Sequence, residues 1–93
     1  MSIFKQKVNT YKIQCDLDKN VRVRQFAEKH AAMGTVIETR AHGSLLAKNV
    51  RVTVTFKSTE TMATIYREFL ESFRGYDIRI SNKSISVYNE GGV

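Results

Sequence analysis

The sequence predicts an α+β domain in which an antiparallel sheet is covered on one face by two helices. Several short segments alternate apolar and polar residues, which is the pattern of half-buried strands. Two longer segments repeat apolar residues at every third or fourth position, as amphipathic helices do. A chain of 93 residues that is 42% hydrophobic suits one core, so we expect residues 1–93 to form a single domain.

The first strand is predicted over residues 7–17. From Tyr11 onward, alternation places its apolar side chains on one face. These side chains are Tyr11, Ile13, Cys15 and Leu17.

Asp18 follows this strand and is expected to cap a helix over residues 19–33 that ends at Gly34. At about 100° per residue, one face of this helix carries Val23, Phe26, Ala27 and His30. Residues 21–24 also alternate valine with arginine, which fits an extension of the strand. Both alternatives therefore stay open.

Two strands are predicted between the helices. Residues 35–41 form the first, with Val36 and Ile37 as its apolar residues. Residues 50–57 form the second, because β-branched residues fill most of its positions and make a helix unfavourable. Residues 45–47 either extend a strand or form a loop.

The second helix is predicted to start at Ser58, as its cap, and to run to Arg74, with Gly75 ending it. Its apolar residues follow the i, i+3, i+4, i+7 spacing of a buried helical face. They are Met62, Ile65, Tyr66, Phe69, Leu70 and Phe73.

The last segment is predicted to be a β-hairpin with Asn82-Lys83 as its two-residue turn. In that register two apolar pairs face each other, Ile80 with Ile85 and Ile78 with Val87. Residues 90–93 are expected to be a frayed tail.

The predicted order is therefore strand, helix, strand, strand, helix, strand, strand. Its first six elements, within residues 8–81, resemble the ferredoxin-like split β-α-β arrangement (βαββαβ), to which the hairpin adds an extra C-terminal strand. The resemblance implies a sheet with one open face. It rests on element order alone and carries no residue motif, so it implies little about function.

Positive charge is the strongest functional signal in the sequence. The chain has 15 Lys and Arg against 9 Asp and Glu, a formal net charge of +6. Residues 1–57 hold eleven of these bases and four of the acids, so the surplus belongs to the N-terminal part. Such asymmetry favours an anionic partner, with nucleic acid as the commonest candidate. A surplus that serves solubility alone is the simpler alternative.

We therefore expect a small, basic, non-enzymatic nucleic-acid-binding protein that contacts the phosphate backbone, with RNA favoured over DNA. Lysine and arginine bind phosphate oxygens, and hydroxyl side chains on a strand face add hydrogen bonds. The candidate binding residues lie on the predicted strands, on the first helix and in the segment before the first strand. They are Lys5, Lys7, Lys12, Lys19, Arg22, Lys29, Arg40, Arg51, Lys57 and Arg79.

Proteins of the RNA-recognition-motif family have the same order of elements, and they stack bases on exposed aromatic residues of their first and third strands. The outward positions on those two strands are here Lys12, Gln14, Arg51, Thr53 and Thr55. None of them is aromatic. The sequence therefore argues against membership in that family and predicts binding led by charge.

No set of residues points to catalysis. Cys15 shares the apolar face of its strand and His30 that of its helix, so both are expected in the core. His42, in a predicted turn before Gly43, is the one candidate catalytic base. Acylphosphatases share this size and element order, but residues 18–20 begin with the acid Asp18 and lack the glycine of their phosphate-binding loop. Two histidines and one cysteine also make a poor metal site, so we expect no enzyme, no cofactor and no metal.

A protein-binding inhibitor or adaptor is the alternative function, for example a phage-encoded protein that acts on a host enzyme or defence system. The small size and a terminal hairpin with a free edge favour it. A homodimer through the open sheet face or the C-terminal hairpin is a further alternative. A lone cysteine and the lack of any long apolar run predict a cytoplasmic protein without a membrane partner.

Overall fold

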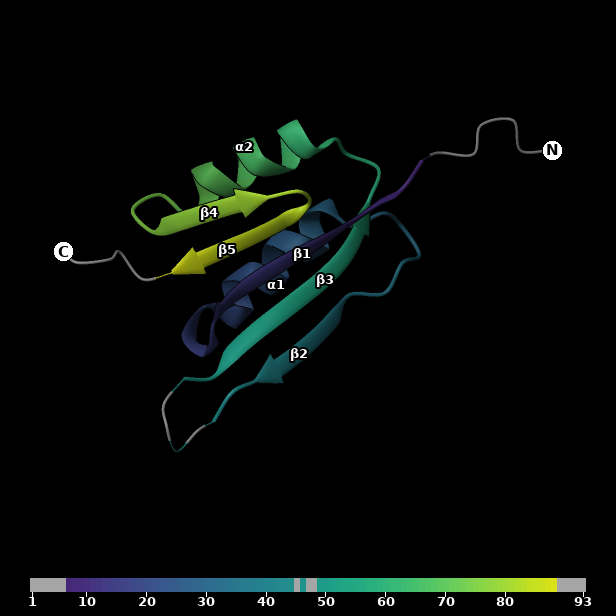
Figure 1. Ribbon diagram of the computed structural model, residues 1–93. Helices are drawn as coiled ribbons and strands as arrows, with labels where there is room; N and C mark the ends of the chain where they lie inside the picture. The colour runs from purple at the N-terminus through teal and green to yellow at the C-terminus, as the bar shows by residue number, and fades with distance from the viewer. Residues whose placement is uncertain (1–6, 45, 47–48, 89–93) are drawn as a thin grey trace.

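Strand β1 (Asn9–Asp16) runs through the middle of a five-stranded sheet, and two helices pack on one face of that sheet (Figure 1). The computed structural model describes residues 7–44, 46 and 49–88, so the predicted tail at 90–93 lies outside the described residues. The other elements are η1 (Leu17–Lys19), α1 (Asn20–His30), β2 (Glu38–His42), β3 (Arg51–Ser58), α2 (Met62–Ser72), β4 (Asp77–Ser81) and β5 (Ser84–Tyr88).

The sheet is mixed and has the strand order β2-β3-β1-β5-β4. Strand β1 pairs antiparallel with β3 and parallel with β5, whereas the β2–β3 and β4–β5 pairs are antiparallel. The sequence predicts an antiparallel sheet in the ferredoxin-like order with one extra C-terminal strand. The structure differs, because β1 and β5 are parallel and β5, not β4, lies beside β1. Strand β5 takes the place beside β1 that the fourth strand has in the ferredoxin-like order.

The composition of the hairpin explains why β5 and not β4 lies inside the sheet. Ile85 and Val87 of β5 are completely buried. Strand β4 carries the charged residues Asp77 and Arg79, and its Ile80 is exposed. A strand paired along both edges shields apolar side chains from water, whereas an edge strand keeps charged side chains solvated.

The predicted register of the hairpin is confirmed. Its apolar pairs are Ile80 with Ile85 and Ile78 with Val87. Lys83 has a φ of +60° and is the one non-glycine residue in the described part of the chain with a positive φ. A type I′ turn needs positive φ at both central residues, so this turn is of another type. Tyr66 of α2 holds the turn, because its hydroxyl accepts a hydrogen bond from the backbone N–H of Lys83 at 2.8 Å.

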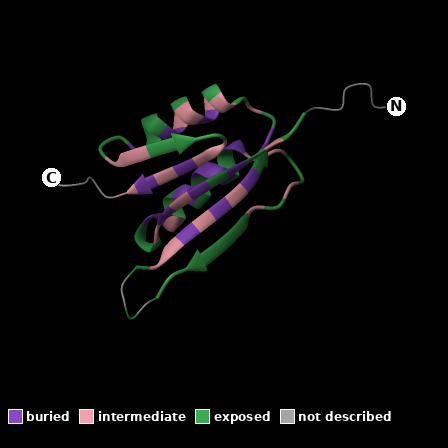
Figure 2. Ribbon diagram, in the orientation of Figure 1, coloured by how far each residue is buried: buried purple, intermediate pink, exposed green. Residues whose placement is uncertain are grey.

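Both helices bury one face against the same side of the sheet (Figure 2). The ring centre of Phe26 on α1 lies 5.1 Å from that of Phe69 on α2, in an edge-to-face arrangement that joins the two helices. The buried hydrophobic residues form one core cluster. Its members are Tyr11, Ile13, Cys15, Val23, Phe26, Ala27, Val52, Val54, Phe56, Ile65, Phe69, Phe73, Ile85 and Val87.

Helix α1 is shorter than the predicted 19–33, by one residue at its start, where the 3-10 turn η1 precedes it, and by three at its end. Asp18 lies in that turn and does not cap the helix. Leu17 lies there too, and its side chain is exposed instead of joining the apolar face of β1. The helix ends at His30, and Gly34 lies in the loop beyond it. Residues 21–24 are helical, so the strand alternative is wrong.

Helix α2 is capped by Thr61, whereas the sequence predicts Ser58 as the cap. The Thr61 hydroxyl accepts a hydrogen bond from the backbone N–H of Thr64 at 3.3 Å. Ser58 is the buried last residue of β3, and its hydroxyl accepts a hydrogen bond from the backbone N–H of Glu60 at 3.0 Å. The chain therefore makes a short polar turn between β3 and the start of the helix.

Strand β2 starts three residues later than predicted, at Glu38. Ile37 packs against the core, but Val36 is 77% exposed and lies outside the strand. His42 is the last residue of β2 and not part of a turn. All five residues of β2 are exposed (Figure 2), so this edge strand lacks cover on either face. Among the residues left open by the sequence, Leu46 lies exposed in a turn, and 45 and 47 lie outside the described residues.

Phe69 and its neighbour Leu70 test the packing of α2. Phe69 is completely buried, whereas Leu70 is 46% exposed although its spacing predicts a core position. We expect Phe69→Ala to lower the free energy of unfolding by about 3–5 kcal/mol, because it leaves a cavity in the core. Leu70→Ala is the matched control and is expected to cost about 1 kcal/mol or less. Urea denaturation measures both values, and equal losses would contradict the assigned helix face.

Cys15 is buried in the core with a free thiol. Burial raises the pKa of this thiol to about 11, and the nearby Arg51 guanidinium offsets only part of that rise. Burial also raises the pKa of Tyr11. Both groups are therefore held in the neutral form by the fold.

The raised pKa of Cys15 predicts a slow reaction with iodoacetamide in the native protein. At pH 8 we expect alkylation about 100-fold slower than in guanidinium chloride, because an unfolded thiol has a pKa of about 8.5. Stability from this group is complete below about pH 8.5 and is lost as the pH rises toward 11. Cys15→Ala should remove that part of the alkaline loss and leave the part due to Tyr11. Equal native and unfolded alkylation rates would show that the thiol is accessible.

Candidate nucleic-acid interface

The sheet face opposite the helices is open and carries polar side chains from all five strands. Alternation with the buried residues of β1, β3 and β5 assigns the residues of these strands to it. They are Thr10, Lys12, Gln14, Asp16, Arg51, Thr53, Thr55, Lys57, Ser84, Ser86 and Tyr88. Strand pairing adds Glu38, Arg40 and His42 from β2 and Asp77, Arg79 and Ser81 from β4.

Three basic side chains span adjacent strands of this face. Thr10 pairs with Lys57, and Lys12 pairs with Thr55. Lys12 and Lys57 are therefore diagonal neighbours on β1 and β3, with backbone positions about 7–8 Å apart. Arg40 of β2 lies opposite Thr53 on the other side of β3.

Two of the five bases on the open face are paired with acids. Asp16 pairs with Arg51, and Asp77 pairs with Arg79. Glu38 forms no ion pair within the described part of the chain. The same holds, among the residues described, for the other three bases, which are Lys12, Arg40 and Lys57. Five bases against three acids leave this face with a surplus of two positive charges.

Arg51 is anchored across three strands. Its guanidinium donates hydrogen bonds to Asp16 Oδ1 at 2.8 Å and to the backbone oxygens of Gln14 at 3.4 Å and Val87 at 3.5 Å. It also lies 4.4 Å from the ring centre of Tyr88. These contacts join β3, β1 and β5, so Arg51 stabilises the sheet while it contributes charge.

Tyr88 is an aromatic residue of the open face that sequence reasoning did not select. Arg51 and Arg79 both lie over its ring, at 4.4 Å and 5.3 Å from the ring centre. The Arg79 side chain is 73% exposed, so part of its planar guanidinium faces solvent. The alternation of Ser84, Ser86 and Tyr88 along the last strand is the sequence signal that could have identified this residue.

His42 also belongs to the open face. Its Nε2 lies 3.2 Å from Thr53 Oγ1 and 3.3 Å from Gln14 Nε2, within hydrogen-bonding distance of both. These contacts connect β2 with β3 and β1. The ring is therefore part of the polar network of the face, and neither of these two partners is an acid that would orient it as a catalytic base.

Two predicted binding residues near the start of α1, Lys19 and Arg22, make contacts that stabilise the fold. Lys19 is 4% exposed, and its ammonium lies 3.6 Å from the Asp16 carboxylate. Arg22 lies 4.5 Å from the ring centre of Phe73 and donates a hydrogen bond to the backbone oxygen of Ser72 at 2.7 Å. Both side chains therefore fasten α1 and the turn before it to the rest of the protein.

The remaining predicted binding residues lie away from the open face or beyond the described part. Lys29 is exposed on α1, Lys7 is exposed before β1, and Lys5 lies outside the described residues. The structure thus brings together five of the ten predicted residues. They are Lys12, Arg40, Arg51, Lys57 and Arg79.

His30 is a core residue, as the sequence predicts. Its Nδ1 lies 2.9 Å from Glu60 Oε2, and its ring centre lies 4.4 Å from that of Phe26. Its Nε2 is buried and has no hydrogen-bond partner among the described atoms. The pair ties the end of α1 to the loop before α2, which is a structural role.

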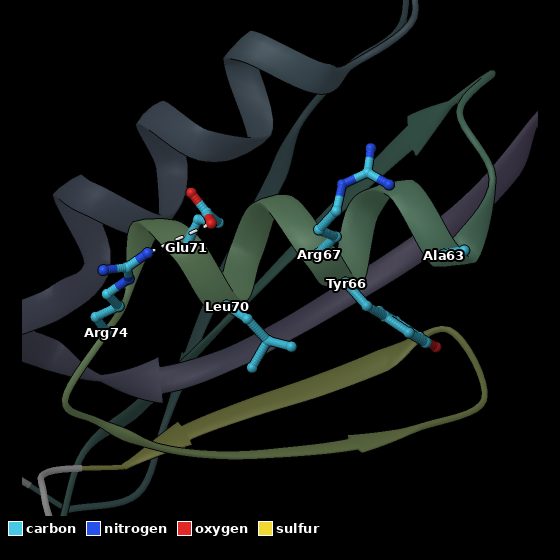
Figure 3. A pocket seen from close by; sticks show the side chains of 6 residues that line it. All are labelled: Ala63, Tyr66, Arg67, Leu70, Glu71 and Arg74. Carbon is cyan, nitrogen blue, oxygen red and sulfur yellow. Dashed lines mark hydrogen bonds and ion pairs between the residues drawn. The ribbon is translucent and has the colours of Figure 1, made fainter.

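A hollow of about 440 Å³ lies along α2, between Tyr66 and Arg74 (Figure 3). Its charged residues are exposed, and Arg74 pairs with Glu71 at 3.5 Å across one end. Ala63, Leu70 and the ring of Tyr66 supply the apolar part of its lining. The hollow therefore has the character of an ordinary helix surface and lacks the buried polar groups of a ligand site.

Comparison with protein-family models, curated proteins and solved structures gives no match for this chain. In the described ranges 7–44, 46 and 49–88, no helix is both long and apolar enough to cross a membrane. The same residues contain no group of three or more His, Cys, Asp and Glu side chains that could hold a metal ion.

Arg51 and Lys57 test which bases of the open face support the sheet. We expect Arg51→Ala to lower the free energy of unfolding by about 1–3 kcal/mol, since it removes charge-assisted hydrogen bonds and leaves Asp16 without this partner. Lys57→Ala removes an exposed side chain and is expected to stay within about 0.5 kcal/mol of the wild-type value. Chemical denaturation followed by circular dichroism measures both. A harmless Arg51→Ala would contradict the anchoring role.

Proposed function

We propose that this protein binds single-stranded nucleic acid, with RNA favoured over DNA, on the open face of its sheet. The observation that carries the proposal is the set of three exposed bases without ion pairs in the described part of the chain. These bases are Lys12, Arg40 and Lys57. Exposed, unpaired ammonium and guanidinium groups are available to phosphate oxygens. The guanidinium of Arg51 is less available, because it already donates hydrogen bonds within the sheet.

The surroundings of these bases support a nucleic-acid ligand. Thr53, Thr55, Ser84 and Ser86 place hydroxyl groups between the basic side chains, where they can hydrogen-bond to phosphate and sugar oxygens. A ribose 2′-hydroxyl adds a donor and an acceptor that deoxyribose lacks, which favours RNA. The strand face thus offers both charge and hydrogen bonds to a sugar-phosphate backbone.

The ring of Tyr88, with Arg51 and Arg79 over it, favours single-stranded over double-stranded nucleic acid as the ligand. Unpaired bases stack on aromatic rings and on arginine guanidinium planes, and a duplex keeps its bases inside. The exposed Arg79 guanidinium over the Tyr88 ring supplies such a plane at the side of the face. Binding would therefore combine phosphate contacts at the three unpaired bases with stacking at the β4–β5 side.

Fluorescence anisotropy with a labelled single-stranded RNA of mixed sequence tests the proposal. We expect binding at low salt whose logarithmic affinity falls with the logarithm of salt concentration with a slope of about −2, since about three phosphates are neutralised. The double variant Lys12→Glu with Lys57→Glu should weaken binding at least about tenfold and flatten this slope. A duplex RNA of the same sequence should bind more weakly.

The matched control carries the same change of charge on the helical side, as Lys29→Glu with Arg67→Glu. Both control residues are exposed on α1 and α2. It should retain most of the wild-type affinity. An equal loss in both double variants would mean that net charge and not the open face attracts the RNA. Absence of binding at low salt would remove the proposal altogether.

A further inference from the structure

Strand β2 forms one edge of the sheet, and its outer side has no partner strand in the described chain (Figure 1). All five of its residues, Glu38 to His42, are exposed. An exposed edge strand presents backbone N–H and C=O groups that can pair with another strand. Charged side chains on an edge strand disfavour such pairing unless they find partners of opposite charge. Two charged residues lie on β2, Glu38 and Arg40, and neither forms an ion pair within the described part of the chain.

The spacing of these two charges makes the edge complementary to itself. Glu38 and Arg40 lie two residues apart on the same open face, with Thr39 between them on the other face. When two copies of β2 pair antiparallel around Thr39, Glu38 of each copy lies opposite Arg40 of the other. Two reciprocal ion pairs then form about one twofold axis.

The neighbouring registers lack this complementarity. Pairing around Glu38 or around Arg40 sets two like charges opposite each other, which is unfavourable. Pairing around Ala41 sets Arg40 opposite His42. The register around Thr39 also brings Ile37 of one copy opposite Ala41 of the other on the helix side, where Ala41 is otherwise exposed.

We propose that the protein forms a homodimer through antiparallel pairing of β2 around Thr39, which joins two five-stranded sheets into one. The interface is the β2 edge, and the partner is a second copy of this chain. The dimer needs no nucleic-acid ligand to form. It pairs Arg40 with Glu38 of the second copy, so phosphate contacts in the dimer rest on Lys12 and Lys57 of each copy.

The opposite edge of the sheet explains why β2 is the pairing strand. Strand β4 also carries an acid and a base two residues apart, Asp77 and Arg79. These two residues already pair within the chain at 3.3 Å, and Arg79 lies over the ring of Tyr88. Their charges are satisfied in the monomer, whereas Glu38 and Arg40 have no ion-pair partner among the described residues and would gain one from a second copy.

Sedimentation equilibrium across a range of protein concentrations, without nucleic acid, tests the dimer. We expect wild-type protein to reach twice the monomer mass with rising concentration. Arg40→Glu and Glu38→Arg should each raise the dimer dissociation constant at least about tenfold, because each replaces two attractive pairs by two repulsive ones. The double variant Glu38→Arg with Arg40→Glu should restore it, since the pairs are then merely exchanged.

Arg79→Glu on β4 is the matched control and should leave the dimer unchanged. Circular dichroism and urea denaturation check that every variant remains folded, which is expected because Glu38 and Arg40 are exposed. A wild-type protein that stays monomeric at every concentration overturns the proposal. So does a dimer that survives Arg40→Glu, or one that the double charge exchange fails to restore.

Discussion

The pairing of β1 along both of its edges is the constraint on which the rest of the structure depends. Strand β1 meets β3 on one side and β5 on the other, and its residues Tyr11, Ile13 and Cys15 are completely buried under the helices. Because strand residues alternate between faces, a buried apolar stripe on one side commits the intervening residues to the other. The intervening residues of β1 therefore face away from the core irrespective of their own hydrophobicity. They are Lys12, Gln14 and Asp16.

The same alternation in the neighbouring strands separates the protein into two chemically distinct faces. One face is closed by α1 and α2 around a ring cluster that includes Phe26 and Phe69. The other collects small hydroxyl residues and bases, and Arg51 ties three of its strands together. Stability and surface charge are thus supplied by residues that alternate along the same strands.

The two edges of the sheet differ in how their charges are satisfied. At β4, Asp77 and Arg79 pair with each other and Arg79 also lies over the Tyr88 ring, so both charges have partners within the chain. At β2, Glu38 and Arg40 form no ion pair with any described residue, and all five residues of the strand are exposed. Antiparallel pairing at β2 keeps the two open faces on the same side of the enlarged sheet. A dimer would therefore present one continuous face, with Lys12 and Lys57 of both copies available to a longer strand.

The sequence by itself determined the order of strands and helices, the burial of Tyr11, Ile13 and Cys15 on β1 and of Ile65, Phe69 and Phe73 on the α2 side, and the register of the C-terminal hairpin. These follow from local periodicity, which is a property of each segment alone. It misplaced both caps: Thr61 caps α2 in place of Ser58, and α1, which directly follows η1, has no side-chain cap at its N-cap residue Lys19. The position of β5 beside β1, the burial of Lys19 and the meeting of Tyr88 with Arg51 were decided only by the tertiary structure. Each of them depends on which distant strands become neighbours, and periodicity within one segment carries no information about that choice.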